Sequence, residues 1–212
     1  MTNPLDRVPP HLVVADFLPA ADHAALIDWT LANQARFEPS GLGRGRALDT
    51  GFRNSLSLRG EGPRPWVAPL TDRIRPLVPD WCAALGITPF TLDQIEFDMV
   101  AYNDGAFYRR HVDTGVGGGR TPAPGSAAFR MITAVYYFHR EPKRFQGGAL
   151  RLHSLAHDIS YGDVPPSQNS LAIFPAWARH EVMPVACPSR DFADSRFAIN
   201  CWVRRAAVGG AA

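Results

Sequence analysis

The stretch Leu92-Asp-Gln-Ile-Glu-Phe-Asp-Met-Val-Ala-Tyr102 decides the fold class, because its side chains change character at every second position. One face of an extended chain would carry Ile95, Phe97, Met99 and Ala101, and the other would carry Glu96, Asp98, Val100 and Tyr102. A period of two is typical of a β-strand. The stretch therefore predicts a strand with two chemically different faces.

Downstream of this strand, the sequence predicts further short strands separated by glycine and proline. We expect them at residues 130–138, 148–153, 170–174, 180–186 and 195–203. Residues 113–125 and 158–169 are predicted to be long loops. Many short strands with this punctuation favour a sandwich or a barrel.

Upstream of residue 90, the apolar side chains recur at helical spacing instead. Residues 22–34 predict one helix, and residues 66–85 predict two short helices interrupted by Pro76 and Pro79. Residues 54–58 are a short strand candidate between them. We therefore expect one structural domain with three parts. These are a helical support region at 1–89, a β core at 90–205 and a flexible tail at 206–212.

The composition is that of an ordinary globular protein. Of the 212 residues, 46% are apolar and 20% are charged, and the net charge of +2 predicts no general nucleic-acid-binding surface. Cys82, Cys187 and Cys201 are far apart, which argues against a disulfide framework or a structural zinc site and fits a reducing cytoplasm. Since no apolar run approaches the ~18 residues of a membrane span and no signal-peptide pattern is present, we expect a cytoplasmic protein.

The tripeptide His111-Val112-Asp113 predicts a metal site. Side chains two positions apart share one face of an extended chain, so this imidazole and this carboxylate can reach the same ion. His180 opens another predicted strand and can supply a third ligand from the opposite side. Two imidazoles and one carboxylate suit Fe(II) and leave coordination positions open. Ordinary hydrogen-bonded positions are expected for the remaining histidines, which are His11, His23, His139, His153 and His157.

Several motifs, in order along residues 92–204, resemble those of the 2-oxoglutarate/Fe(II)-dependent prolyl hydroxylases. The similarity is greatest to the oxygen-sensing and bacterial prolyl 4-hydroxylase branch. The motifs are Tyr102-Asn-Asp-Gly-Ala-Phe-Tyr108-Arg-Arg-His111-Val-Asp113, Tyr136-Tyr137, Gly147-Gly148-Ala-Leu150-Arg-Leu152, His180-Glu-Val-Met-Pro184 and Arg196-Phe-Ala-Ile-Asn-Cys-Trp202.

This resemblance implies a mainly β fold, a double-stranded β-helix (jelly roll) with N-terminal helices packed on it. It implies Fe(II) held by His111, Asp113 and His180, with 2-oxoglutarate and O2 as cosubstrates and ascorbate as a reductant. The distal carboxylate of 2-oxoglutarate would pair with Arg196 and Tyr137, and Tyr102 would lie close to it. The candidates for substrate contact or for supporting the site are Tyr108, Asn200, Trp202 and Arg190.

Two arginines compete for the role of carboxylate anchor. On its predicted strand, Arg196 shares a face with Asn200 and Trp202. A guanidinium can form two parallel hydrogen bonds with a carboxylate. Arg190 is ten residues beyond His180, where this family often places its basic residue. We favour Arg196, because the motif Arg-Phe-Ala-Ile-x-x-Trp carries the sequence match.

The resemblance also implies a reaction, namely hydroxylation of a C–H bond with release of succinate and CO2. A prolyl residue of a protein or peptide is the expected target. Asp113 favours hydroxylation, because related halogenases lack the carboxylate at this position. The glycine-rich loop at 114–130 is longer than in prolyl hydroxylases and predicts either a lid or a disordered segment. A small-molecule substrate, such as a free amino acid, therefore stays open as an alternative.

Other classes agree less well with the sequence. Nucleic-acid demethylases share the H-x-D…H…R pattern, but they typically end in R-x-N-x-T-x-R, and the run from Arg196 differs. The H-x-H pair of cupin barrels is absent, and Pro184 occupies the position where a zinc peptidase needs its second histidine. A non-catalytic jelly-roll module that binds a metal or ligand is the remaining alternative. We expect no nucleic-acid or membrane partner, and the sequence does not determine the oligomeric state.

Overall fold

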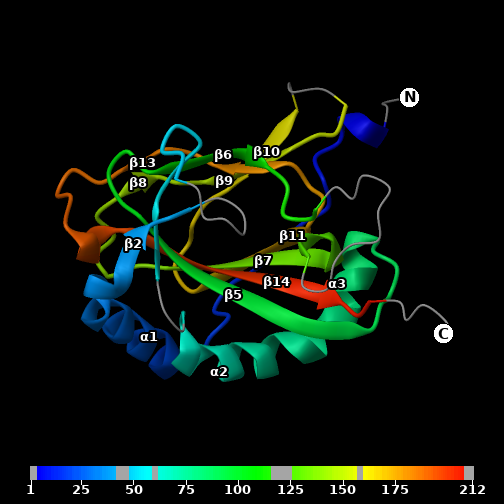
Figure 1. Cartoon of the computed structure of the whole chain (residues 1–212), viewed down its shortest axis with the longest axis horizontal. Coiled ribbons are helices and arrows are strands. Elements are labelled where there is room, and N and C mark those ends of the chain that lie inside the picture. Colours follow the sequence, from blue (N-terminus) through cyan, green and yellow to red (C-terminus); the bar gives the residue numbers. More distant parts are fainter. Residues whose placement is uncertain (1–3, 42–47, 59–61, 116–125, 157–159, 208–212) are drawn as a thin grey trace.

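The computed structural model describes residues 4–41, 48–58, 62–115, 126–156 and 160–207 of the chain. Two antiparallel sheets face each other, and the helices cover the outer face of the larger sheet (Figure 1). Most of the expected tail at 206–212 and most of the loop at 114–130 lie outside the described residues.

The larger sheet has seven strands, all joined by antiparallel pairing. In spatial order they are β1 (Leu12–Val14), β11 (Ser170–Pro175), β7 (Arg130–Phe138), β14 (Arg196–Arg205), β5 (Leu92–Tyr102), β4 (Leu56–Leu58) and β2 (Phe37–Pro39).

The smaller sheet has five strands, and a separate pair lies beside it. The five strands are β10 (Tyr161–Val164), β9 (Leu150–His153), β12 (His180–Val182), β6 (Phe107–His111) and β3 (Arg53–Asn54). The separate pair is β8 (Gln146–Gly147) with β13 (Val185–Ala186).

From β5 onward the chain alternates between the two sheets. It passes from β5 to β6 in the smaller sheet, returns to β7, crosses to β9 and β10, and returns to β11 before β12 and β14. This alternation winds the two sheets into a double-stranded β-helix. The predicted mainly β jelly-roll fold is therefore confirmed.

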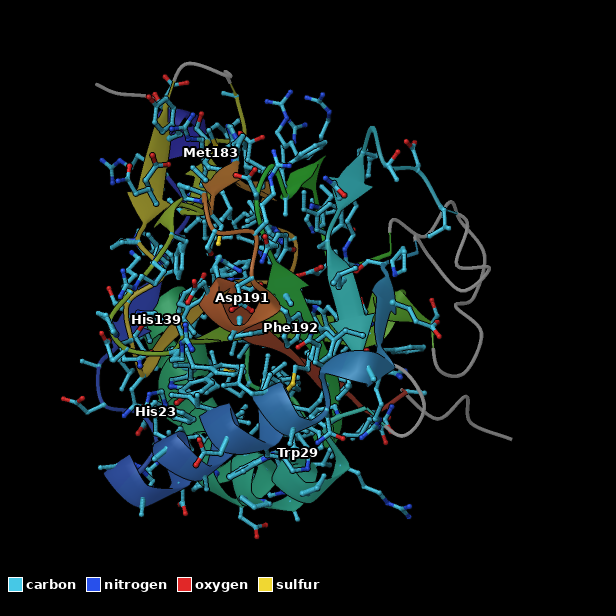
Figure 2. All side chains as sticks on the ribbon, turned by 90° about the vertical axis from the view of Figure 1, so that its left-hand side faces the viewer. His23, Trp29, His139, Met183, Asp191 and Phe192 are labelled. Carbon is cyan, nitrogen blue, oxygen red and sulfur yellow. The ribbon has the colours of Figure 1, made fainter. Side chains whose placement is uncertain are left out.

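The helices pack on the larger sheet through the first of two apolar clusters. The helices are α1 (Ala20–Ala32), α2 (Arg64–Ile74) and α3 (Val78–Leu85), with short 3-10 turns η1 (Pro4–Asp6), η2 (Gln34–Arg36), η3 (Arg75–Leu77), η4 (Ala127–Phe129) and η5 (Phe192–Asp194). Leu26 and Leu70 of the helices and Met99 of β5 are fully buried in this cluster. Figure 2 shows His23 and Trp29 on the helical side and Met183 on the opposite side.

The second apolar cluster fills the space between the two sheets. Val100, Tyr137 and Ala198 come from the larger sheet, and Leu152 and Val182 come from the smaller one. The two faces predicted for residues 92–102 are thus confirmed, because Met99 packs toward the helices while Val100 packs toward the smaller sheet. Only this inner face can contribute to a site between the sheets.

The predicted bounds of strands and helices agree best with the observed bounds in long, regular segments. The strand expected at 130–138 has the same bounds as β7, and two helices occupy the stretch expected at 66–85. The loop expected at 158–169 was wrong in part, because β10 forms within it through pairing with β9. The strand expected at 54–58 divides at Ser55, since Asn54 pairs with β6 of the smaller sheet and Leu56 pairs with β5 of the larger one.

Two further findings concern the cysteines and the helices. All three cysteines lie among the described residues, and each is buried and unpaired. No helix in the described residues is long and apolar enough to cross a membrane.

Candidate active site

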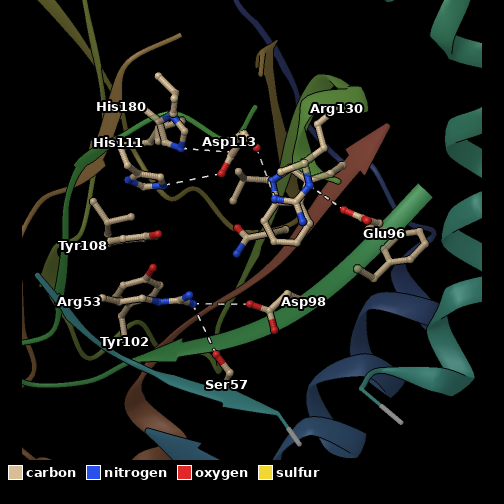
Figure 3. A pocket seen from close by; sticks show the side chains of 18 of the residues that line it. Arg53, Ser57, Glu96, Asp98, Tyr102, Tyr108, His111, Asp113, Arg130 and His180 are labelled. Carbon is tan, nitrogen blue, oxygen red and sulfur yellow. Dashed lines mark hydrogen bonds and ion pairs between the residues drawn. The ribbon is translucent and has the colours of Figure 1, made fainter. Parts of the chain in front are cut away.

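A cavity of about 680 Å³ lies between the two sheets and is lined by most of the residues that the sequence singled out (Figure 3). Its walls come from β5, β7 and β14 of the larger sheet and from β6 and β12 of the smaller sheet. It has an end lined by His111, Asp113 and His180, an end lined by Arg196 and Tyr137, and a polar outer wall.

The first end is a group of side chains that could hold a metal ion. His111 ends β6 and His180 begins β12, and these two residues are directly opposite each other in the antiparallel pair. Asp113 follows β6, where its backbone N–H donates to the carbonyl oxygen of Ala176 at 3.0 Å. The candidate ligand atoms of the three side chains all lie within 4.8 Å of one another. The structure thus brings together the predicted triad.

Neighbouring groups orient each member of this triad. The Nδ1 atoms of His111 and His180 lie 2.8 and 2.9 Å from backbone carbonyl oxygens, which makes Nδ1 the protonated nitrogen. Each Nε2 is then a free acceptor facing Asp113, at 3.7 Å for His111 and 3.4 Å for His180. Thr133 donates its hydroxyl to the Asp113 carboxylate at 2.8 Å. Such partners fix the ring orientation that a metal ligand needs.

Burial and the neighbouring ionisable groups together determine the charges of His111 and Asp113. Burial, together with the nearby His180, lowers the pKa of His111 to about 3. Burial disfavours the Asp113 carboxylate, but the neighbouring His180 and His111 outweigh this effect and hold the pKa of Asp113 below its ordinary value. At neutral pH His111 is therefore neutral and Asp113 ionised, which are the protonation states that bind metal.

The second end of the cavity contains a buried cation. Arg196 is 1% exposed, and its guanidinium carbon lies 4.8 Å from the ring centroids of both Tyr102 and Tyr137. Its Nε donates to the carbonyl oxygen of Gly148 at 2.9 Å. Among the described residues, neither Arg196 Nη1 nor the Tyr137 hydroxyl has a hydrogen-bond partner, although both are buried.

These unpartnered donors fit the acidic end of a ligand. Burial raises the pKa of Tyr137 to about 12, so its hydroxyl stays protonated and can donate. A buried polar group without a hydrogen-bond partner lowers the stability of the folded protein. A carboxylate in the cavity would accept hydrogen bonds from both Arg196 and Tyr137. The residues present therefore fit the distal carboxylate of 2-oxoglutarate.

The outer wall of the cavity carries charged residues that the sequence did not identify as site residues. Arg53 Nη2 lies 3.6 Å from the Asp98 carboxylate, and Arg130 Nε lies 2.6 Å from the Glu96 carboxylate (Figure 3). The polar face of the strand at 92–102 was a signal for Glu96 and Asp98. No local signal pointed to Arg53, which reaches the cavity from β3 at the edge of the smaller sheet.

The remaining candidates divide into those inside and outside the cavity. Tyr108, Asn200 and Trp202 line it, and the Tyr108 ring stacks on the His111 ring with centroids 3.7 Å apart. Arg190 is not among the residues that line it. Its side chain is 79% exposed and pairs with Asp104, because the residue lies on a surface turn.

The other histidines take ordinary places in the described structure. His11 contacts a backbone carbonyl, His23 contacts the Tyr136 hydroxyl, and His153 lies 2.9 Å from the Glu181 carboxylate. His139 is buried beside the Arg140 carbonyl, and His157 lies outside the described residues.

A jelly roll with two histidines and a carboxylate at one end of its cavity and a buried arginine at the other defines a class, the 2-oxoglutarate-dependent iron oxygenases. The sequence profile of the 2OG-Fe(II) oxygenase superfamily matches residues 97–204, about half of the chain. The chain belongs to that superfamily.

One curated relative matches over a long stretch. It is an uncharacterized PKHD-type hydroxylase of Synechocystis sp., 39% identical over 161 residues that cover 73% of this chain and 50% of the relative. The chain therefore spans about half the length of this relative.

Solved structures with the same fold include two prolyl hydroxylases. A Pseudomonas putida prolyl-4-hydroxylase aligns with a TM-score of 0.61 at 24% identity, over 94% of each chain. A Trichoplax adhaerens prolyl hydroxylase, in complex with a hypoxia inducible factor oxygen degradation domain peptide fragment, aligns with a TM-score of 0.67 at 18% identity, over 92% of this chain and 84% of that one. At these identities the likeness establishes the fold.

Proposed function

We propose that this chain is an Fe(II)- and 2-oxoglutarate-dependent dioxygenase that hydroxylates a C–H bond and releases succinate and CO2. The observation that carries the proposal is the pairing of two groups in one cavity. One group is a His-Asp-His set whose candidate ligand atoms lie within 4.8 Å of one another, with His111 and Asp113 in metal-binding protonation states. The other is a buried arginine and a tyrosine whose donors have no partner among the described residues.

Each residue has a role in this proposal. His111, Asp113 and His180 would hold Fe(II), and Arg196 with Tyr137 would bind the distal carboxylate of 2-oxoglutarate. When bound, the iron and its cosubstrates supply the oxidation of the C–H bond. The Tyr102 ring, which packs beside the guanidinium, would exclude water from that end. Ascorbate is proposed only as a reductant that keeps the iron ferrous.

For the substrate we propose a prolyl residue in a protein or peptide. This rests on the relatives, since the two solved structures named above are prolyl hydroxylases and one of them holds a peptide. Tyr108, Asn200 and Trp202 line the cavity and are the proposed substrate contacts or supports of the site. Trp202 is itself covered by Arg130, whose guanidinium carbon lies 3.8 Å from the ring centroid.

A second candidate is the hydroxylation of a polar small molecule such as a free amino acid. The charged outer wall favours it, because Arg53, Asp98, Glu96 and Arg130 offer both signs of charge to a ligand in the cavity. A prolyl ring has no charge to meet these groups.

Three further proposals concern the chain as a whole. The unpaired cysteines fit a reducing compartment, for which we propose the cytoplasm. We propose one structural domain in which residues 1–89 support the core at 90–205, because β1, β2 and β4 extend the larger sheet of that core. We also propose that the chain binds neither nucleic acid nor a membrane.

The test measures succinate formed from 2-oxoglutarate with Fe(II) and O2, with and without a library of proline-containing peptides. We expect turnover that is lost in His111→Ala and in Arg196→Ala, and a mass increase of one oxygen in a peptide. Turnover that is undiminished in either variant would remove that residue from its role. If no 2-oxoglutarate binds at all, the chain is a non-catalytic module, and if only free amino acids gain oxygen, the second candidate is correct.

A further inference from the structure

Gly148 lies between β8 and β9 and is packed directly against the side chain of Arg196. A Cβ atom built at this position would lie 2.8 Å from Arg196 Cδ and 3.3 Å from Arg196 Nε. It would also lie 2.9 Å from Val185 Cγ2. Contacts below 3.0 Å force something to move, and both neighbours are buried, so a Cβ atom here would displace the Arg196 stem or the Val185 side chain.

The same residue also directs the guanidinium through its backbone. The carbonyl oxygen of Gly148 accepts a hydrogen bond from Arg196 Nε at 2.9 Å. The rings of Tyr102 and Tyr137 confine the guanidinium carbon, which lies 4.8 Å from each ring centroid. With Nε engaged and the rings in place, Nη1 is left without a partner among the described residues and available to a ligand.

The adjacent glycine, Gly147, is constrained by the backbone and not by Arg196. A Cβ atom on Gly147 would collide with the backbone carbonyl of Pro184 and would not meet Arg196. Both glycines have positive φ angles, 71° and 69°, which suit glycine for backbone reasons alone. Only Gly148 combines this backbone requirement with contact to the arginine.

We propose that Gly148 is a positioning residue for the cosubstrate. Its missing side chain leaves the space that the Arg196 stem occupies, and its carbonyl oxygen orients the guanidinium toward the distal carboxylate of 2-oxoglutarate. This inference rests on the proposed function, in which Arg196 binds that carboxylate. It assigns to Gly148 an effect on cosubstrate affinity that is separate from metal binding.

The test compares Gly148→Ala with the wild type by titration calorimetry. Mn(II) is titrated first, and 2-oxoglutarate is then titrated into the Mn(II)-loaded protein. We expect the Kd for 2-oxoglutarate to rise about 10- to 100-fold, the range typical of lost orienting partners. The Kd for Mn(II) should stay within about twofold, because the iron-site residues contact neither Gly148 nor its neighbours Arg196 and Val185 in the described hydrogen bonds.

The matched control for backbone strain is Gly86→Ala. Gly86 has a φ of 66°, and no atom lies within 4 Å of a Cβ built there, so alanine strains the backbone without a collision. This variant should lose stability and keep its affinity for 2-oxoglutarate. An equal loss of 2-oxoglutarate affinity in Gly86→Ala would overturn the proposal, because the effect would then come from general destabilisation.

A second pair of variants covers the case in which Gly148→Ala does not fold. Val185→Ala removes one of the two collisions, so Gly148→Ala/Val185→Ala is compared with Val185→Ala alone. We expect the double variant to bind 2-oxoglutarate about 10- to 100-fold more weakly. Equal affinity in the pair would show that Val185, and not Arg196, transmits the effect, and the proposal would be wrong. If the wild type binds no 2-oxoglutarate, the proposed function itself fails.

Discussion

The two ends of the cavity satisfy their polar groups in different ways. At the iron end, His111, Asp113 and His180 are near one another, and Thr133 and backbone carbonyls complete their hydrogen bonds. At the arginine end, donors stay without partners among the described residues although their side chains are buried. The proposed iron end is thus organised by strand pairing and by hydrogen bonds within the protein, whereas the arginine end has buried donors that an acidic ligand could satisfy.

The comparison predicts that substitutions at the two ends separate metal binding from cosubstrate binding. The largest effect is expected for His111→Ala. Removing one of three ligands should weaken Fe(II) or Mn(II) binding by more than the roughly 10- to 100-fold that the loss of an orienting partner causes, and succinate formation should stop. Metal titration measures this.

The matched control for that variant is His153→Ala. His153 is also buried, but its Nε2 lies 2.9 Å from the Glu181 carboxylate and it does not line the cavity. Metal affinity should be unchanged in this variant. Retention of wild-type metal affinity in His111→Ala would show that the triad is not the metal site.

The next largest effect is expected at the arginine end, for Arg196→Met. Losing one partner of a buried charge pair costs about 2–5 kcal/mol, so the Kd for 2-oxoglutarate should rise by roughly 30-fold or more. The metal affinity should not change. Arg190→Met is the control, because Arg190 is 79% exposed and pairs with Asp104. A larger loss of 2-oxoglutarate affinity in Arg190→Met than in Arg196→Met would make Arg190 the carboxylate anchor instead.

A smaller loss of 2-oxoglutarate affinity is expected for Tyr137→Phe, and this loss should come without a loss of stability in the ligand-free protein. The loss of one hydroxyl donor should weaken 2-oxoglutarate binding by about 1 kcal/mol. The ligand-free protein should keep its stability or gain some, because the buried hydroxyl has no partner among the described residues. Thermal unfolding with and without 2-oxoglutarate measures both effects. A marked loss of stability without ligand would mean that the hydroxyl is already satisfied at this end.

An effect of similar size to that of Tyr137→Phe is expected from pH, and it concerns the iron end. In the metal-free protein, burial lowers the pKa of His111 to about 3, while an unfolded histidine titrates near its ordinary value of 6.5. Between these values the unfolded chain binds a proton that the folded chain does not. This contribution to stability is therefore complete above pH 6.5 and decreases as the pH falls toward 3.

Urea unfolding without metal tests this dependence. From pH 7.5 to pH 5.5, His111 should account for a loss of about 1 kcal/mol. Burial also lowers the pKa of His23 and of His139, so part of the loss should persist in any His111 variant. His111→Ala should show a shallower dependence than the wild type. An identical dependence would mean that His111 is not buried as a neutral imidazole.

Local patterns predicted the strands that carry the site. Alternation over residues 92–102 predicted β5 and both of its faces, and residues 130–138 predicted β7. The order of motifs along the chain predicted the fold and grouped His111, Asp113 and His180, which the structure brings within 4.8 Å. The strand predictions succeeded because periodicity is a property of a short stretch of chain, whereas the fold was implied by the resemblance of several ordered motifs to a known family.

Sequence reasoning failed where the partner of a residue is distant in the sequence. Arg53 lines the cavity only because β3 pairs with β6, and β10 is a strand only because β9 lies beside it. For the anchor, by contrast, the sequence favoured Arg196, and Arg190 lies on a surface turn beside Asp104. Neither pairing nor exposure is encoded in the residues next to these positions.

The sequence by itself determined which chemical groups this protein offers, namely two histidines and a carboxylate that could hold a metal and an arginine on a strand. Side-chain chemistry and the period of two are local, so they can be read from the chain alone. The tertiary structure decided which groups are buried and which donors lack partners. Burial and strand register depend on contacts between distant segments, and they leave Arg196 Nη1 and the Tyr137 hydroxyl, among the described residues, without partners inside the cavity.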